Sequence, residues 1–239
     1  MALLSTLKPN MAAEKIRLFS LIGASIVTIA LWQVPGGNYI LYPFTILATW
    51  FHEMAHGLMA FAMGGKFQRL IIFSNGSGMA YYSGPLFLEP ISTVLVAAAG
   101  PMGPPLAGAG LIMASRNPKA SSIILRCLGF FLFFSALVWV RSLFGFVAVF
   151  IMGAIVLGIS FMKSQGIRNF AVQFIGVQAC VATYFQIDYL FSYSAGPLGL
   201  SDTGRIQEIL FLPYWFWGAL MAVGSLLILI ASLRFAYRS

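Results

Sequence analysis

Two histidines, with a glutamate directly after the first, are the residues of this chain best suited to chemistry. His52 and His56 are its only histidines, and the run between them reads His-Glu-Met-Ala-His. This is the pattern H-E-x-x-H, in which the glutamate is Glu53. On an α-helix, residues i and i+4 lie on one face, so both imidazoles can bind one metal ion, expected to be Zn²⁺. Glu53 would then act on a water bound by that ion.

The element that must carry this pentad is an apolar stretch from about Tyr39 to Met63. Hydrophobic residues make up 60% of the 239 residues and charged residues only 8%, which excludes an ordinary soluble domain. Apolar runs of about 20 residues are candidate transmembrane helices. The composition predicts an all-α polytopic membrane protein with six or seven transmembrane helices, in which residues 1–239 form a single integral membrane domain. The predicted spans are residues 17–34, 39–63, 91–114, 121–140, 142–162, 170–190 and 212–233.

The net charge of +8 comes from basic residues that lie between and beside the predicted spans. Such residues anchor helices to lipid headgroups, so the expected partner is the lipid bilayer and not a nucleic acid. We expect a multi-pass protein, in the bacterial cytoplasmic membrane. Lys66 and Arg69, together with the N-terminus, favour a cytoplasmic N-terminus, whereas basic residues of later connections such as Arg116 and Lys119 oppose it.

Two segments interrupt the apolar pattern. Residues 67–83 contain two strand-like runs around the turn sequence Asn-Gly-Ser-Gly, which predicts a small β-hairpin directly after the H-E-x-x-H helix. A hairpin has edges that cannot face lipid, so it must lie against protein, in a cavity or at the interface. The second segment, residues 191–211, is predicted to be a polar loop that carries Asp202.

The third ligand of the expected metal has to come from an acid. A catalytic zinc usually has three protein ligands and one open position for water, and the chain has no third histidine. The acids downstream of the pentad are Glu89, Asp188, Asp202 and Glu208. Each also has a structural interpretation; Asp202, for example, is suited to the first turn of a capped helix. Asp202 is the leading candidate, with Asp188 and Glu89 as alternatives.

The motifs resemble those of the site-2-type intramembrane zinc metalloproteases of peptidase family M50, and of its M50B-like branch. This family carries H-E-x-x-H on one span, then a β-rich segment, and far downstream a motif similar to L-D-G-G-R. The present chain matches that motif at Asp202, Gly204 and Arg205 and departs from it at Ser201 and Thr203. The aspartate of the family motif is the third zinc ligand, so the resemblance implies this role for Asp202.

A further family motif, A-G-P-x-x-N, corresponds to the run that begins Ala99-Gly100-Pro101. In the family, its asparagine helps to bind substrate near the zinc, but the chain has Gly103 at this position. The resemblance covers residues 39–220, which form the metalloprotease-like core.

The resemblance implies an intramembrane zinc metalloprotease that hydrolyses peptide bonds of membrane-embedded protein or peptide substrates, with water activated by zinc and Glu53. Gly103 keeps open a second interpretation, a non-proteolytic metal-binding scaffold or pseudoprotease that retains membrane clients. A metal transporter is the third, because ionisable residues inside a membrane often mark ion paths. It is less favoured, since the chain lacks a ladder of polar ligands along several spans.

Overall fold

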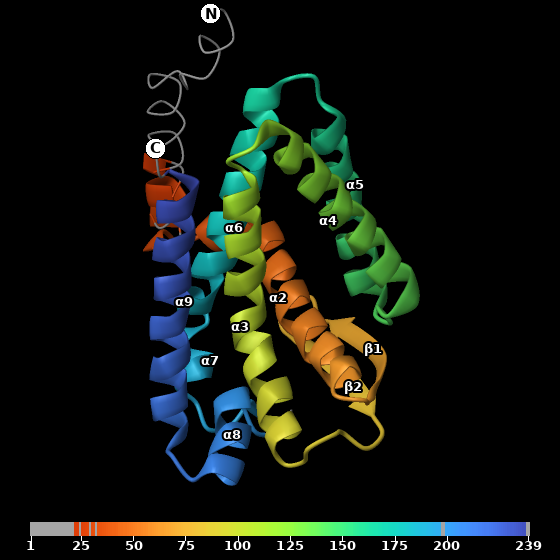
Figure 1. Ribbon diagram of the computed structural model, residues 1–239, viewed down its shortest axis with the longest axis vertical. Helices are drawn as coiled ribbons and strands as arrows, with labels where there is room; N and C mark the ends of the chain where they lie inside the picture. The colour runs from red at the N-terminus through yellow and green to blue at the C-terminus, as the bar shows by residue number, and fades with distance from the viewer. Residues whose placement is uncertain (1–21, 24, 29, 32, 197–198, 238–239) are drawn as a thin grey trace, which may run out of the picture. The chain divides into compact units, whose positions relative to one another are not determined.

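The computed structural model describes residues 22–237, apart from residues 24, 29, 32, 197 and 198. The first predicted span, residues 17–34, lies mainly outside the described residues. The chain divides into two units, Met1–Leu41 and Tyr42–Ser239, and the second unit holds both strands and helices α3 to α9 (Figure 1). The described residues are mostly helical, as predicted.

Helix α2 carries the H-E-x-x-H pentad and is followed by a hairpin. It covers Gly37–Ala62 and ends just before Gly64, whose positive φ of 90° is a conformation that glycine adopts without strain. Strands β1 (Lys66–Ile72) and β2 (Gly78–Ser83) then pair antiparallel. The β-hairpin predicted over residues 67–83 is therefore confirmed.

Strand β1 is paired along both of its edges. On one side Leu70 lies opposite Ala80 of β2. On the other side the Leu70 N–H donates to the Trp139 carbonyl at 2.8 Å, and the Arg141 N–H donates to the Leu70 carbonyl at 2.9 Å. Among the described residues no further strand pairs with β2, so its outer edge is the free edge of this small sheet.

Helix α3 (Ile91–Ala114) lies at the centre of the second unit. A Cβ on Gly108 would lie 2.4 Å from the Gly176 carbonyl oxygen, so the backbones of α3 and α6 touch at a pair of glycines. The absence of side chains at these two glycines lets the helices approach closely. The main neighbours of α3 are α6 (Gln165–Phe185), α8 (Asp202–Leu210) and α9 (Tyr214–Ala236), and the short α7 (Ile187–Leu190) joins α6 to the segment before α8 (Figure 1).

Helices α4 (Pro118–Val138) and α5 (Leu143–Phe161) form an antiparallel pair. Asn117 caps α4, because its side-chain oxygen accepts a hydrogen bond from the Lys119 N–H at 2.8 Å. The pair joins the main buried cluster, in which the fully buried Trp50 of α2 donates its Nε1–H to Ser135 Oγ of α4 at 2.9 Å.

Four of the described helices, α3, α4, α5 and α9, are long and apolar enough to cross a membrane. The predicted number of six or seven spans is not confirmed. Helix α2 carries two imidazoles and a carboxylate, and α6 carries amide side chains such as Asn169 and Gln173, which are buried against protein. Polar groups that face the protein interior lower the mean hydropathy of a helix without exposing it to lipid.

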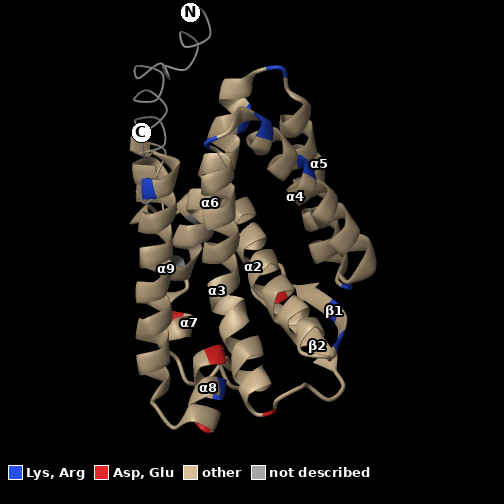
Figure 2. Cartoon of the chain, in the orientation of Figure 1, with Lys and Arg blue, Asp and Glu red and all other residues tan. Residues whose placement is uncertain are grey.

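Charged residues are distributed unevenly over the second unit (Figure 2). Basic residues gather at the α3–α4 and α5–α6 connections, although others lie on β1 and α8. Most of the acids lie toward the opposite end, on α7 and α8 and ahead of α3, and Glu53 lies inside α2. The cytoplasmic orientation of the N-terminus stays a prediction.

Candidate metal centre

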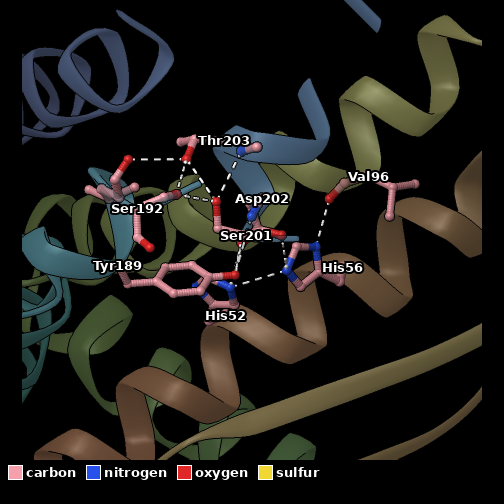
Figure 3. A network of polar contacts seen from close by, with 10 residues as sticks. His52, His56, Val96, Tyr189, Ser192, Ser201, Asp202 and Thr203 are labelled. Atoms are coloured by element: carbon pink, nitrogen blue, oxygen red, sulfur yellow. Dashed lines mark hydrogen bonds and ion pairs between the residues drawn. The ribbon is translucent and has the colours of Figure 1, made fainter. Parts of the chain in front are cut away.

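Three side chains from two elements far apart in sequence converge on one point (Figure 3). His52 Nε2 lies 3.1 Å from Asp202 Oδ2, and His56 Nε2 lies 3.3 Å from Asp202 Oδ1. The two Nε2 atoms lie 3.1 Å from each other. Among the described residues, this is the group of three or more histidines, cysteines and acids whose ligand atoms lie close enough to hold one metal ion.

Helix α2 places both imidazoles on the face that it turns toward α3, and a glycine on α3 makes room for them. A Cβ on Gly100 would lie 2.2 Å from His56 Nε2 and 2.7 Å from His52 Nε2. Any larger residue at this position would therefore occupy the space between the imidazoles. Gly100 belongs to the A-G-P run of the sequence, and the requirement for glycine is steric.

Asp202 is held by the start of α8. Ser201 is the N-cap residue, and its hydroxyl accepts a hydrogen bond from the Gly204 N–H at 3.0 Å. The buried Thr203 hydroxyl donates to the Leu190 carbonyl at 3.1 Å, which fixes the helix start against α7. The segment predicted as a polar loop thus becomes a capped helix from Asp202 onward, and Asp202 is both a first-turn acid and the neighbour of the imidazoles.

The Asp202 carboxylate is ionised in this setting. Burial alone would raise its pKa, but the adjacent imidazoles of His56 and His52 hold the pKa of Asp202 well below its ordinary value. A buried carboxylate needs a positive partner or hydrogen-bond donors, and among the described residues the two imidazoles and the Tyr189 hydroxyl contact it.

The proton of His56 can be placed from its contacts. Its Nδ1 lies 2.7 Å from the Val96 carbonyl oxygen, which can only accept a hydrogen bond, so Nδ1 carries the proton. Nε2 faces the carboxylate of Asp202 and Nε2 of His52. Because the facing atoms can all act as acceptors, a cation is needed between them, either a proton on one of the imidazoles or a metal ion.

The donor set fits zinc. Ligand atoms about 2.0–2.1 Å from a tetrahedral Zn²⁺ lie roughly 3.3 Å from one another. The two imidazole nitrogens lie 3.1 Å apart, and each lies 3.1 or 3.3 Å from a different oxygen of the Asp202 carboxylate, distances close to that value. The hydrogen bond from His56 to Val96 is the kind of outer contact that orients a metal-binding imidazole.

Glu53 points toward the hairpin. Its side chain is only 7% exposed, and its carboxylate accepts a hydrogen bond from the backbone of Ala80. The approach of β2 is close, since a Cβ on Gly78 would lie 2.7 Å from Glu53 Cγ. Glu53 therefore stands beside the three converging side chains and is not one of them.

A cavity of about 600 Å³ opens next to these residues. Its wall contains His52, Glu53, His56 and Asp202, and opposite them the turn and outer edge of the hairpin. The hydroxyl of Thr49 donates to the Gly76 carbonyl at 2.6 Å, which fixes the hairpin turn on α2. The site is thus a cavity between α2, α3, the hairpin and the α7–α8 segment, with a cluster of ionisable side chains in its wall.

The other candidate acids are placed elsewhere. Asp188 lines the cavity but does not contact either imidazole. Glu208 accepts a hydrogen bond from the hydroxyl of Tyr193 at 2.5 Å, and Glu89 is exposed ahead of α3. The structure therefore brings Asp202 to the histidines, and does not bring the two alternatives, Asp188 and Glu89.

Sequence reasoning missed two features of the site. Tyr189 donates its hydroxyl proton to Asp202 at 3.0 Å, and no spacing rule distinguishes it from the other tyrosines. Gly103, at the asparagine position of the family motif, is a helix contact, because a Cβ there would lie 2.4 Å from Ala55 Cβ and 3.0 Å from the Phe51 carbonyl oxygen. A side chain at position 103 would meet α2.

Comparison with known proteins gives one match. The family model described as Peptidase M50B-like matches residues 21–232 of the chain. No curated protein and no solved structure shows a significant match to the chain.

Proposed function

The chain belongs to the peptidase M50B-like family, and from this premise we propose that it is an intramembrane zinc metalloprotease. Family membership and the four apolar helices make it an integral membrane protein. The observation that carries the proposal is the convergence of His52, His56 and Asp202, with Glu53 beside them, in the wall of one cavity. The proposed reaction is hydrolysis of peptide bonds in membrane-embedded protein or peptide substrates.

The residues would divide the work as follows. His52, His56 and Asp202 hold the zinc, which, when bound, polarises a water and lowers its pKa toward about 7. Glu53 accepts a proton from the attacking water and returns it to the leaving amide nitrogen, which balances the hydrolysis. Asp202 cannot take this proton, because its carboxylate faces the imidazoles and its pKa is held low.

The outer edge of β2 would hold the substrate. Helical amides are shielded by their own hydrogen bonds, so a membrane helix has to unwind before a peptide bond can be attacked. An extended segment can then add to a free strand edge, and Gly78, Met79 and Ala80 of that edge line the cavity. Because Glu53 contacts β2 at the same place, a strand added there would lie next to the proposed base.

The test is cleavage of a reporter membrane segment by purified protein in proteoliposomes, with zinc content measured in the same samples. Wild-type protein should cleave the reporter and hold about one zinc per chain. Glu53→Gln should keep the zinc and lower the rate by about 10²–10⁴-fold, the usual contribution of a general base. His52→Ala should lose both zinc and activity.

Two outcomes would contradict the proposal. Cleavage by Glu53→Gln at the wild-type rate would exclude Glu53 as the base. A wild-type protein that binds zinc and retains the reporter without cutting it would favour the scaffold interpretation, which the glycine at position 103 motivates.

A further inference from the structure

Tyr189 of α7 makes a two-way contact with Asp202 (Figure 3). Its hydroxyl donates to Asp202 Oδ2 at 3.0 Å, and the Asp202 backbone N–H donates to the phenol oxygen at 3.3 Å. Because the backbone N–H approaches the lone pairs of the phenol oxygen, the single O–H is directed at the carboxylate. The ring of Tyr189 also stands edge-on to that of His52, with centroids 6.0 Å apart.

The two oxygens of the Asp202 carboxylate have different partners. Asp202 Oδ2 receives the Tyr189 hydroxyl and lies 3.1 Å from His52 Nε2, whereas Oδ1 lies 3.3 Å from His56 Nε2. A carboxylate can rotate about its Cβ–Cγ bond, and such torsions are broad. The hydrogen bond to Tyr189, together with the backbone contact, holds the rotation at the value that turns both oxygens toward the imidazoles.

The contact of Tyr189 with Asp202 is analogous to the contact of the Val96 carbonyl with His56. Val96 accepts from the far nitrogen of one ligand, and Tyr189 donates to the carboxylate of another. Outer contacts of this kind orient the groups that bind a metal, and removing one typically weakens metal binding by about 10–100-fold.

We propose that Tyr189 is a positioning residue that holds the Asp202 carboxylate in its metal-binding orientation. Of the proposed function, the inference requires only that His52, His56 and Asp202 bind zinc. It concerns the affinity of that site for Zn²⁺ and requires no cleavage.

The experiment compares two Tyr→Phe variants four positions apart. Tyr189→Phe removes the hydroxyl and keeps the ring against His52. Tyr193→Phe removes a hydroxyl that donates to the exposed Glu208, outside the three converging side chains, and is the matched control. The dissociation constant for Zn²⁺ is measured by competition with a chelator on purified full-length protein. Tyr189→Phe should weaken zinc binding by about 10–100-fold, and Tyr193→Phe should leave it unchanged.

A second comparison separates positioning from a general loss of structure. In an Asp202→Ala background the two imidazoles still bind zinc weakly, and Tyr189 has no carboxylate to position. Adding Tyr189→Phe there should cause no further loss, since residues that act through one another are non-additive. An equal loss in both backgrounds, or wild-type affinity in Tyr189→Phe alone, would overturn the proposal.

The result is separable from the proposed function. If the wild-type protein binds zinc without cutting a reporter, proteolysis fails as a function while the Tyr189 comparison still gives its answer. If cleavage occurs and Tyr189→Phe binds zinc as tightly as wild type, proteolysis stands and the positioning role fails.

Discussion

The site region and the α4–α5 pair differ in which side chains they bury and which they expose. The site region brings two imidazoles and two carboxylates together in the protein interior. Helices α4 and α5 contain neither acids nor histidines, and large apolar side chains such as Phe130, Leu137 and Ile155 remain exposed on them. Exposed apolar surface of this extent is suited to contact with lipid, whereas ionisable groups are costly in lipid and here lie in the wall of a cavity inside the protein.

Glycines show the difference most directly. Gly100 of α3 leaves space for two imidazoles, whereas Gly129 of α4 leaves space for Leu157 of α5. A Cβ on Gly129 would lie 2.5 Å from Leu157 Cγ and 3.2 Å from its backbone nitrogen. The same residue type therefore makes room for two imidazoles in one region and for helix packing in the other. Substitutions in the site region should therefore change zinc binding, whereas substitutions in the α4–α5 pair should change stability alone.

The largest effect is expected from Gly100→Ala. The added methyl group would lie between the two Nε2 atoms, so zinc binding should be lost, with a decrease in affinity of at least about 100-fold, the upper end for an outer contact. Gly110→Ala on the same helix meets nothing within 4 Å and is the control. Zinc content and chelator competition measure the result. Normal zinc binding by Gly100→Ala would contradict the claim that Gly100 leaves the space needed by the two imidazoles.

The next effect distinguishes the acids. Asp202→Ala should remove a ligand and reduce zinc stoichiometry at a fixed chelator concentration. Asp188→Ala changes an acid of the same cavity that does not contact the imidazoles, so zinc stoichiometry should stay at the wild-type value. The measurement is metal analysis of purified protein. The reverse pattern would mean that the third ligand has been misassigned.

A smaller effect, on stability alone, is expected from Gly129→Ala. Overpacking of a close contact usually costs about 1–3 kcal/mol, so the free energy of unfolding should fall by that amount while zinc affinity is unchanged. Gly158→Ala on α5 has open space around it and corrects for the helix preference of alanine. Denaturant titration in mixed micelles gives the free energy. A zinc defect in Gly129→Ala would show that the two regions are coupled.

The smallest effect concerns a buried side-chain hydrogen bond between the two regions, from Trp50 of α2 to Ser135 of α4. Ser135→Ala leaves the buried indole N–H without its partner, which costs about 1–3 kcal/mol. The packing of the new methyl group offsets a small part of this cost. The expected loss of unfolding free energy is about 1 kcal/mol, measured as above. Ser122→Ala, also on α4 but only half-buried and with its hydroxyl bonded to the exposed Pro118 carbonyl, should have a much smaller effect. A zinc affinity changed by Ser135→Ala would contradict the separation.

Much of this protein could be predicted from local sequence. The H-E-x-x-H helix, the hairpin after it and the apolar helices all follow from residue periodicity and turn chemistry, which act over a few residues. The number of spans could not be predicted in the same way, because α2 and α6 mix apolar residues with buried polar ones such as Glu53 and Gln173. Hydropathy averages over a helix and does not register which face is buried.

By itself, the sequence determined that His52 and His56 share one face of a helix with Glu53 between them, because this depends only on helix geometry. It also limited the third ligand to a few acids. Only the tertiary structure showed which of these acids lies against the imidazoles, because it depends on how α8 folds back to bring Asp202 to them. The tertiary structure also showed that side chains at positions 100 and 103 would meet α2, and that the Tyr189 hydroxyl contacts the Asp202 carboxylate. These contacts join segments that are distant in sequence, so they depend on packing that no local pattern encodes.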